Sequence, residues 1–491
     1  GSMGLAGVLF LSFAAMSPLT GALGNVPYAV GFGNGSGAPA GFIIGGALFV
    51  LFSVGYVAMT RRMSSSGGLY TYVSHCLGRP MGMASGWAAV ASYVLIEAAV
   101  VCLFAYFARN TIASTFNVDI SWPWYALLCL IAVAVSAHFD MAFNARLLAV
   151  ALVLEVVILA IMDVAVLAQG GADGIDFSPL NPANALTGPA PLIGVFFAIY
   201  CWTGFEIIPN FAEESKNPKR TGARALYIVV IVEGLFFLVT SWAVILGWGI
   251  SKAPDAAAKD PANFFFDVTG QFAGNGTKVV MEWLILTSTF ACALAFHNTA
   301  ARYLYAIGRE GLLHQKLGHT HHAHKSPHIA SMVTAVVAGV LIVGMVGLWA
   351  VAAPINEFAD FASMPYVEIY GWFGVAATFL ILCNLAVTSL ATVFYFSTGD
   401  GRGEGHIWKT MLAPGLSFLV LGGLLIAFWA NITTFGGDVL LVRLIPPLCI
   451  LWFVLGVLFA AVLRRTRPDA YQSLGRLVNV GMEHMDEEPV A

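Results

Sequence analysis

The chain has 491 residues, of which 59% are hydrophobic and only 10% charged, and its mean hydropathy is +0.81. A chain with so little polar surface cannot cover the core of a soluble protein, so the sequence predicts a polytopic membrane protein. The formal net charge of −4 is small, and the basic residues lie in short clusters between apolar runs. This pattern excludes nucleic acid as an expected partner and leaves the lipid bilayer as the surroundings of the chain.

Twelve apolar runs are long enough to cross a bilayer, which needs about 20 helical residues for each crossing. They cover approximately residues 5–32, 38–60, 82–108, 123–139, 145–168, 190–212, 225–250, 279–308, 329–351, 367–397, 411–431 and 440–463. The longest connections, 169–189 and 251–278, are rich in Asp, Asn, Pro and Gly, which predicts loops. We therefore expect an all-α protein with 12 transmembrane helices and no soluble domain.

The distribution of Lys and Arg predicts the orientation of these spans. With the N-terminus in the cytoplasm, 18 of the 23 basic residues lie at or toward the cytoplasm. The five on the other side are Arg109, Lys252, Lys259, Lys278 and Arg443. Because cytoplasmic loops retain positive charge during insertion, we expect a plasma-membrane protein with both termini in the cytoplasm.

The first apolar run carries no Asp, Glu, Lys, Arg or His before Thr60, yet it contains several residues that disfavour a helix. Pro18, Gly21, Gly24 and Pro27 each weaken or remove helical hydrogen bonds. Irregular backbone at membrane depth is tolerated only where protein or a water-filled cavity satisfies it. We therefore expect the first transmembrane helix to be discontinuous.

The sixth apolar run has the same character. The stretch "FFAIYCWTGFEIIPNFAEESKNPKR", residues 196–220, places Thr203 and Gly204 at the expected break and Pro209 shortly after. Breaks in spans one and six occupy corresponding positions of two five-helix halves, which indicates an inverted-repeat transporter with its binding site between the broken helices. In such a site free N–H groups favour an anion and freed carbonyls favour a cation, so an amino acid satisfies both.

Three motifs resemble the amino acid–polyamine–organocation (APC) superfamily of permeases. "GFEIIPNFAEESKNPKRTGARA" looks like the family's sixth-helix signature, "TRRMSSSGGLYTYVSHCLGRPMGMASGW" resembles its connection from span two to three, and "HNTAARYLYAIGREGLLHQKLGHTHHAHKSPHIA" its span eight to nine segment. The resemblance implies a five-plus-five inverted repeat and alternating access driven by a proton or sodium gradient. The implied units are the first repeat 1–170, the second repeat 190–397, spans 11 and 12 within 411–463, and a cytoplasmic tail 464–491.

The resemblance also implies the site residues of span six. Tyr200 falls where family members place an aromatic gate, and Cys201 and Thr203 would offer carbonyls to the ligand's amine. Trp202 is positioned to stack on a ligand cation or, equally, to face lipid. Glu206 takes the family's acidic position, where a carboxyl group could exchange a proton as the site opens to each side.

The residues of span one fit the family pattern less closely. The usual glycine-small-glycine step is not obvious in "SPLTGALGN", and the candidates for the ligand carboxylate are Ser17, Thr20, Gly21, Ala22 and Gly24. This departure leaves room for ligands without a carboxylate, such as amines.

A second departure concerns the coupling ion. Some family members have a lysine in span five that takes the place of sodium, and the corresponding position here is Glu155. A carboxylate cannot mimic a cation, but it can bind one or carry a proton, so a proton is the expected coupling ion and sodium remains open.

Other ionisable residues of the spans have no assigned role. Glu97, Glu233, Asp163, Glu282 and His297 can each pair with neighbouring helices or, for the acids near span ends, reach water. The seven cysteines form no CxxC motif, and the histidines of 319–328 have no cysteine partners, so we expect no metal site and no cofactor.

The sequence therefore predicts a secondary transporter that imports a small amino acid with protons. A polyamine or ethanolamine-type permease and an amino acid exchanger are alternatives within transport, and a non-transporting sensor with a permease fold is the alternative from another class. No nucleophile–base pair is evident on neighbouring spans, so we do not expect an enzyme. The expected partners are the small-molecule substrate and the lipid bilayer, and no protein partner can be assigned.

Overall fold

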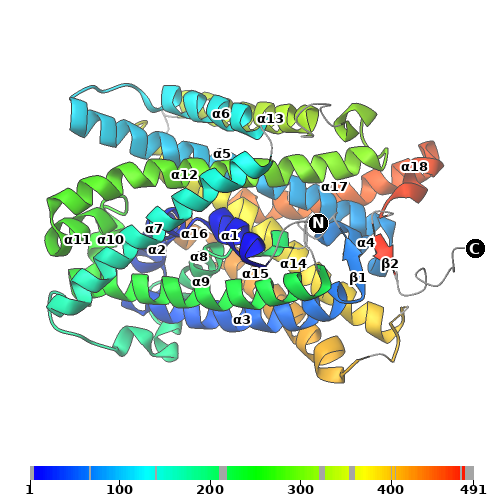
Figure 1. Cartoon of the computed structure of the whole chain (residues 1–491), viewed down its shortest axis with the longest axis horizontal. Helices are drawn as coiled ribbons and strands as arrows, with labels where there is room; N and C mark the ends of the chain where they lie inside the picture. The colour runs from blue at the N-terminus through cyan, green and yellow to red at the C-terminus, as the bar shows by residue number, and fades with distance from the viewer. Residues whose placement is uncertain are drawn as a thin grey trace, which may run out of the picture.

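The computed structural model describes residues 5–65, 68–138, 141–208, 218–319, 327–352, 360–399, 401–403, 405–475 and 478–480. The described chain is a helical bundle with one short strand pair (Figure 1). Its α-helices are α1 (Leu5–Met16), α2 (Pro18–Tyr28), α3 (Ala38–Thr60), α4 (Leu69–Leu77), α5 (Arg79–Phe116), α6 (Trp122–His138), α7 (Met141–Gln169), α8 (Pro191–Tyr200), α9 (Pro218–Trp248), α10 (Ala253–Lys259), α11 (Phe264–Ala273), α12 (Asn275–Arg309), α13 (His328–Ala352), α14 (Gly374–Ser397), α15 (Ala413–Ala430), α16 (Ile432–Gly436), α17 (Leu440–Thr466) and α18 (Pro468–Ser473). Segments of π-helix occur at Ala29–Gly33, Pro365–Phe373 and Trp408–Leu412, and 3-10 turns at Gly35–Gly37, Ser178–Leu180, Pro182–Leu186 and Gln315–Gly318.

Ten helices of the described chain are long and apolar enough to cross a membrane, and each corresponds to one of the twelve runs found in the sequence. The other two runs form shorter helices. The run 5–32 is divided between α1 and α2, and the run 123–139 forms α6, which has 17 residues. The prediction of a helical, multi-pass membrane protein is confirmed.

The helices form a peripheral group and a central group. In Figure 1, α6 and α13 lie side by side along one margin, next to α5 and α12, and α3 and α9 lie together along the other. The two halves of the broken first span and α8 lie between these layers. α5 and α8 bury most of their side chains and belong to the interior of the bundle. α13, α15 and α17 leave many apolar side chains exposed and form part of the lipid-facing surface.

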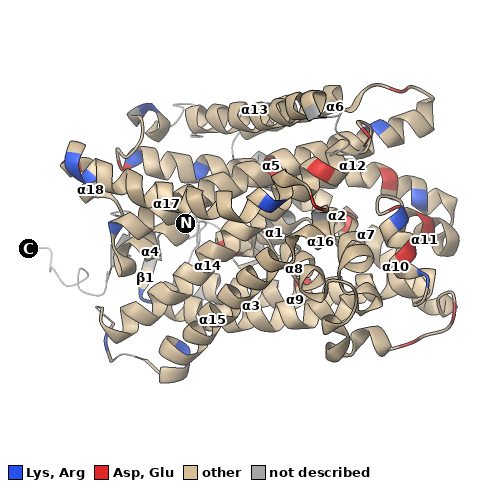
Figure 2. Cartoon of the chain, turned by 180° about the vertical axis from the view of Figure 1, so that it is seen from behind, with Lys and Arg blue, Asp and Glu red and all other residues tan. Residues whose placement is uncertain are grey.

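Charged residues gather at the two ends of the bundle. Figure 2 shows Lys and Arg at the end that carries α18, and Asp and Glu mixed with Lys and Arg at the opposite end, around α10 and α11. Fewer charged residues lie in the middle of the bundle, and they include several buried carboxyl groups.

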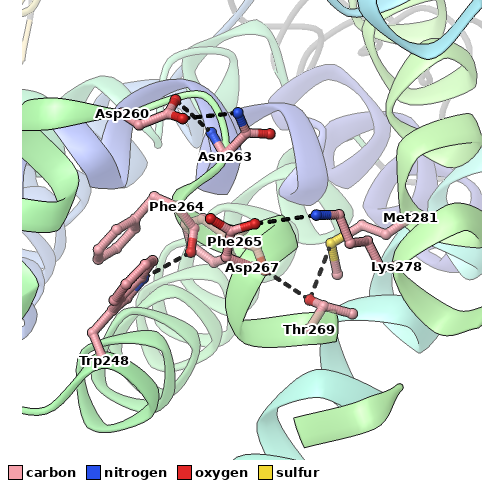
Figure 3. A network of polar contacts seen from close by, with 9 residues as sticks. All are labelled: Trp248, Asp260, Asn263, Phe264, Phe265, Asp267, Thr269, Lys278 and Met281. Carbon is pink, nitrogen blue, oxygen red and sulfur yellow. Dashed lines mark hydrogen bonds and ion pairs between the residues drawn. The ribbon is translucent and has the colours of Figure 1, made fainter. Parts of the chain in front are cut away.

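The connection 251–278, expected as a loop, contains the helices α10 and α11. Figure 3 shows how polar contacts fix this segment. Trp248 at the end of α9 donates its Nε1–H to the Phe264 carbonyl at 2.9 Å, and Lys278 at the start of α12 donates to Asp267 at 3.1 Å. Asp260 accepts hydrogen bonds from the backbone and side-chain nitrogens of Asn263. The local Asp and Asn residues that suggested a loop therefore serve as turn and pairing residues of a short helical hairpin.

The described part of the tail folds back onto the bundle. Strand β2 (Val478–Val480) pairs antiparallel with β1 (Met63–Ser65), which directly follows the second span. Glu310, after α12, accepts the backbone N–H of Gly475 at 3.1 Å. The tail thereby connects the ends of the second, eighth and twelfth predicted spans.

Candidate functional site

The first predicted span is interrupted at Ser17, which has a left-handed backbone conformation with φ 47°. Pro18 explains this local geometry, because a proline disfavours helical angles in the residue before it and has no N–H to donate. Of the four residues predicted to weaken this helix, Pro18 lies at the break, whereas Gly21, Gly24 and Pro27 lie within the continuous helix α2. The interruption is therefore confined to one position.

The first amides of α2 are bound by side chains of distant helices. The Leu19 N–H donates to Glu155 Oε2 at 3.2 Å, and the Thr20 N–H donates to Ser288 Oγ at 3.1 Å. Glu155 comes from α7 and Ser288 from α12. These are the N–H groups that a broken helix leaves without partners, so a carboxylate of the protein itself occupies the position expected for an anionic group of the ligand.

Hydroxyl groups complete the surroundings of Glu155. The Ser17 hydroxyl lies 3.1 Å from Glu155 Oε2 and 2.9 Å from Ser288 Oγ, and the Thr20 hydroxyl lies 2.7 Å from Ser288 Oγ. All four side chains are buried. The predicted candidates Ser17, Thr20 and Glu155 thus meet in one polar cluster with Ser288 of the eighth predicted span.

The sixth predicted span is interrupted between α8, which ends at Tyr200, and a 3-10 turn at 205–208. Gly204 lies between them with φ 118°, a conformation that residues with a side chain rarely adopt. The break is therefore at the predicted place.

Glu206 closes the break of the sixth span. Its Oε2 accepts the Gly204 N–H at 3.0 Å, and its Oε1 accepts the Tyr93 hydroxyl of α5 at 2.6 Å. The carboxyl group is fully buried. Glu206 therefore ties the broken backbone to the third predicted span and does not itself line the cavity described next.

Between the two breaks lies a cavity with roughly 270 Å³ of space not filled by atoms. Its lining residues are Met16, Thr20, Gly21, Asn25, Ile96, Val100, Tyr200, Cys201, Thr203, Cys292, Phe296 and Tyr370. The polar lining side chains are each at most 5% exposed, so the cavity lies in the interior of the bundle. Its neutral hydroxyl, amide and thiol groups, set among apolar walls, suit a small polar ligand.

Five of the predicted substrate residues line this cavity, namely Thr20, Gly21, Tyr200, Cys201 and Thr203. The others lie elsewhere. Ala22 is buried among other side chains, and Gly24 packs against Tyr370 so closely that a Cβ would lie 2.1 Å from the tyrosine oxygen.

Trp202 also lies away from the cavity. Its Nε1–H donates to the Val230 carbonyl of α9 at 3.1 Å, and its ring packs against Phe42 and Phe49 of α3. The structure thus answers a choice that the sequence left open, because this indole faces neither the ligand space nor lipid.

Three polar lining residues were missed by sequence analysis, Asn25, Cys292 and Tyr370. The Tyr370 hydroxyl donates to Asn25 Oδ1 at 2.8 Å, and the Asn25 amide points to the sulfur of Cys201 at 3.7 Å. Tyr370 also stacks on Tyr200 with ring centroids 6.0 Å apart. Tyr370 belongs to the π-helix Pro365–Phe373, a type of helix that often occurs at functional sites but has no reliable sequence signature.

The remaining ionisable candidates lie away from the cavity. Asp163 accepts the Thr240 hydroxyl at 2.8 Å, Glu233 is buried on α9, and Glu282 is partly exposed near the start of α12. Within the described residues, no group of three or more His, Cys, Asp or Glu could hold a metal ion. Residues 320–326 of the histidine-rich segment, and 209–217 after the sixth-span break, lie outside the described residues.

Comparison with known proteins gives the family context. A family model described as amino acid permease matches residues 3–459. The chain is 25% identical over 358 residues to the low-affinity putrescine importer of Escherichia coli K12, covering 70% of each chain. It is 23% identical over 316 residues to a branched-chain amino acid permease of Bacillus subtilis, covering 60% of this chain and 65% of the relative. It is 24% identical over 388 residues to the human cationic amino acid transporter 4, covering 71% and 56%.

Proposed function

Because the chain belongs to the amino acid permease family of the APC superfamily, we propose that it is a secondary active transporter that imports a small amino acid across the plasma membrane together with protons. The chain is a membrane transporter of amino acids or amines and not an enzyme. The observation that carries the proposal is the buried cavity between two interrupted helices.

The proposed architecture has 12 spans, of which 1–170 and 190–397 form two inverted repeats, 411–463 adds spans 11 and 12, and 464–491 is a cytoplasmic tail. The interruption of the first span of each proposed repeat supports this division. The excess of Lys and Arg at the α18 end supports cytoplasmic termini.

In the proposed mechanism the structure corresponds to the occluded state of an alternating-access cycle, and the cavity is the ligand-binding site. The ligand's ammonium group would be bound by oxygens of Thr20, Asn25 and Thr203, with Tyr200 and Tyr370 as aromatic walls. Opening requires the two breaks to bend, so the carboxyl groups that hold them, Glu155 and Glu206, are the proposed sites where protonation acts on transport.

One observation favours an amine substrate as the second candidate. The amides of Leu19 and Thr20 that would bind a ligand carboxylate are already bonded to Glu155 and Ser288. A diamine needs no such group, and one relative is a putrescine importer. Amino acid binding would instead require these amides to exchange partners.

A ligand panel tests the proposal. Purified protein is heated with single L-amino acids and with putrescine, at two pH values and with or without sodium, and the ligands that raise the melting temperature are tested for uptake into liposomes. We expect uptake driven by a proton gradient. Val100→Phe, which fills the cavity, should abolish it, whereas Leu128→Phe on the exposed face of α6 should not. The proposal fails if no ligand stabilises the protein or accumulates under either gradient.

A further inference from the structure

A second polar cluster connects three helices outside the breaks. His297 of α12 lies with Nδ1 2.8 Å from Glu97 Oε1 of α5, and with Nε2 2.7 Å from the Ser331 hydroxyl of α13. Glu97 and His297 are 0% exposed. These three side chains form a continuous hydrogen-bonded row through the protein interior.

The row lies directly behind the cavity wall. Ile96 of α5 and Phe296 of α12 line the cavity, and Glu97 and His297 are the next residues of the same two helices. Because successive residues of an α-helix point about 100° apart, the pair turns from the cavity toward the neighbouring helices. A charge on the pair therefore lies on the residues directly following two that line the ligand space.

One oxygen of the Glu97–His297 pair lacks a hydrogen-bond partner. Glu97 Oε2 is buried and has no hydrogen-bond partner among the described residues. An ionised carboxylate accepts hydrogen bonds at both oxygens, and a buried net charge is costly. The arrangement therefore favours a pair of zero net charge, in which one proton is held between glutamate and histidine.

Among the described residues, His297 is the ion-pair partner shown for Glu97. α6, packed against both helices, contributes Cys129, α13 contributes the hydroxyl of Ser331, and the π-helix Pro365–Phe373, packed against α5, carries the buried Glu368. The nearest carboxyl groups of the two breaks have other partners. Glu206 is bonded to Tyr93, one turn before Glu97. Glu155 lies in the cluster with Ser17 and Ser288. Loss of the shared proton would leave a net negative charge on Glu97 and His297.

We propose that Glu97 and His297 together form a proton-binding site, separate from the carboxyl groups at the two breaks, whose charge acts on a cationic group in the cavity. An ammonium group in the cavity stabilises the deprotonated, negatively charged pair, so it binds more weakly while the pair keeps its proton. The two binding events then oppose each other by thermodynamic linkage. The linkage between proton and ligand rests on the proposed function, because it assumes a ligand with an ammonium group.

The proton site can be tested without any ligand. Infrared difference spectra of the purified protein, recorded as the pH is raised, should contain linked imidazole and carboxyl signals when the shared proton is lost. Glu97→Gln and His297→Gln should each remove both signals. Asp163→Asn, which changes a buried and hydrogen-bonded carboxyl group elsewhere, should leave them in place. A purely structural pair would keep one protonation state, and wild-type spectra without these signals would overturn the proposal.

The folding of the variants is checked by thermal unfolding. If neither substitution folds, Ser331→Ala retains the pair but removes the hydrogen bond to Nε2, so the midpoint of the linked signals should move. An unchanged midpoint would contradict a proton held in this row.

The linkage is tested with putrescine and a pH-indicator dye in weak buffer. Wild-type protein should release protons when putrescine binds, and its affinity should rise about tenfold from pH 6 to pH 8, within the usual range of coupling between sites. Glu97→Gln should show neither effect. Putrescine binding that is independent of pH would overturn the linkage, whereas absence of any ligand binding would argue against the proposed function and leave the infrared result to decide the proton site.

Discussion

The two helix breaks are closed in opposite ways. At the first, the free amides of α2 are bound by Glu155 and Ser288, which are 136 and 268 residues away from their partners in the sequence. At the second, the free Gly204 amide is bound by Glu206, two residues along the same chain. The amides of the first break find their hydrogen-bond partners only when distant helices pack against α2. The amide of the second break finds its partner within its own segment.

This difference suggests a division of roles. Separating α7 or α12 from α2 would leave the amides of Leu19 and Thr20 without partners, so the first break responds to movement between helices. Glu206 keeps its backbone contact in such a movement, and its link to other helices is the Tyr93 hydroxyl. The first break is therefore suited to hold the occluded arrangement, and the second to respond to a proton.

The largest expected effect comes from Glu206→Gln. The amide side chain can still accept the Gly204 N–H, so the fold should persist, but it cannot gain or lose a proton. We expect proton-driven uptake in liposomes to fall roughly ten- to hundredfold. Tyr93→Phe, which leaves the carboxyl group and its backbone bond in place, is the matched control and should retain pH-dependent uptake. Uptake by Glu206→Gln at the wild-type rate under a proton gradient would remove Glu206 from the proposed coupling.

A smaller effect, on stability, is expected at the first break. Glu155→Ala leaves the Leu19 amide and the Ser17 hydroxyl without their acceptor in a buried site, which should cost about 3 kcal/mol. Glu155→Gln retains an acceptor oxygen and should lose less. Unfolding in detergent, followed by tryptophan fluorescence, measures the difference in unfolding free energy. Equal stability of both variants and wild type would show that Glu155 does not hold the break.

The same contrast explains which parts of the site could be predicted from the sequence. The second break is marked by a local feature, Gly204 beside an acidic residue, and it lies where the sequence placed it. The position of the first break depends on Pro18 acting on Ser17 and on acceptors from α7 and α12. The sequence named Pro18 together with Gly21, Gly24 and Pro27, and it does not show which of these residues marks the break.

The cavity lining follows the same rule. Tyr200, Cys201 and Thr203 follow from the position of the second break, whereas Asn25 and Tyr370 are brought together by the π-helix of the tenth predicted span. Hydropathy predicts that a residue lies in a span, but the direction of a side chain inside a bundle depends on packing that the sequence pattern does not show. Trp202, next to two lining residues and yet turned toward α9, illustrates this limit.

Gly204→Ala measures how far the second break depends on backbone conformation alone. With φ 118°, an alanine would strain the backbone, and its Cβ would lie 3.4 Å from Met16 and 3.5 Å from Ala15. We expect a loss of about 1–2 kcal/mol in unfolding free energy, measured by thermal unfolding. Gly222→Ala is the control and should not be destabilised, because Gly222 is helical and an added Cβ would meet no atom within 4 Å. A fully stable Gly204→Ala protein would mean that the break tolerates ordinary backbone geometry.

The smallest effect on ligand binding is expected for Trp202→Phe. The substitution removes the hydrogen bond to the Val230 carbonyl and part of the packing against Phe42 and Phe49, so the melting temperature should fall. The cavity surface is unchanged, so the affinity for any ligand found in the panel should stay within about twofold of wild type, less than the loss of one ordinary hydrogen bond would cause. Tyr200→Phe, which alters a lining hydroxyl, should instead change affinity more than stability. Titration of both variants with the same ligand separates the two cases, and a large affinity loss in Trp202→Phe would place the indole in the ligand's path, contrary to its position against α9.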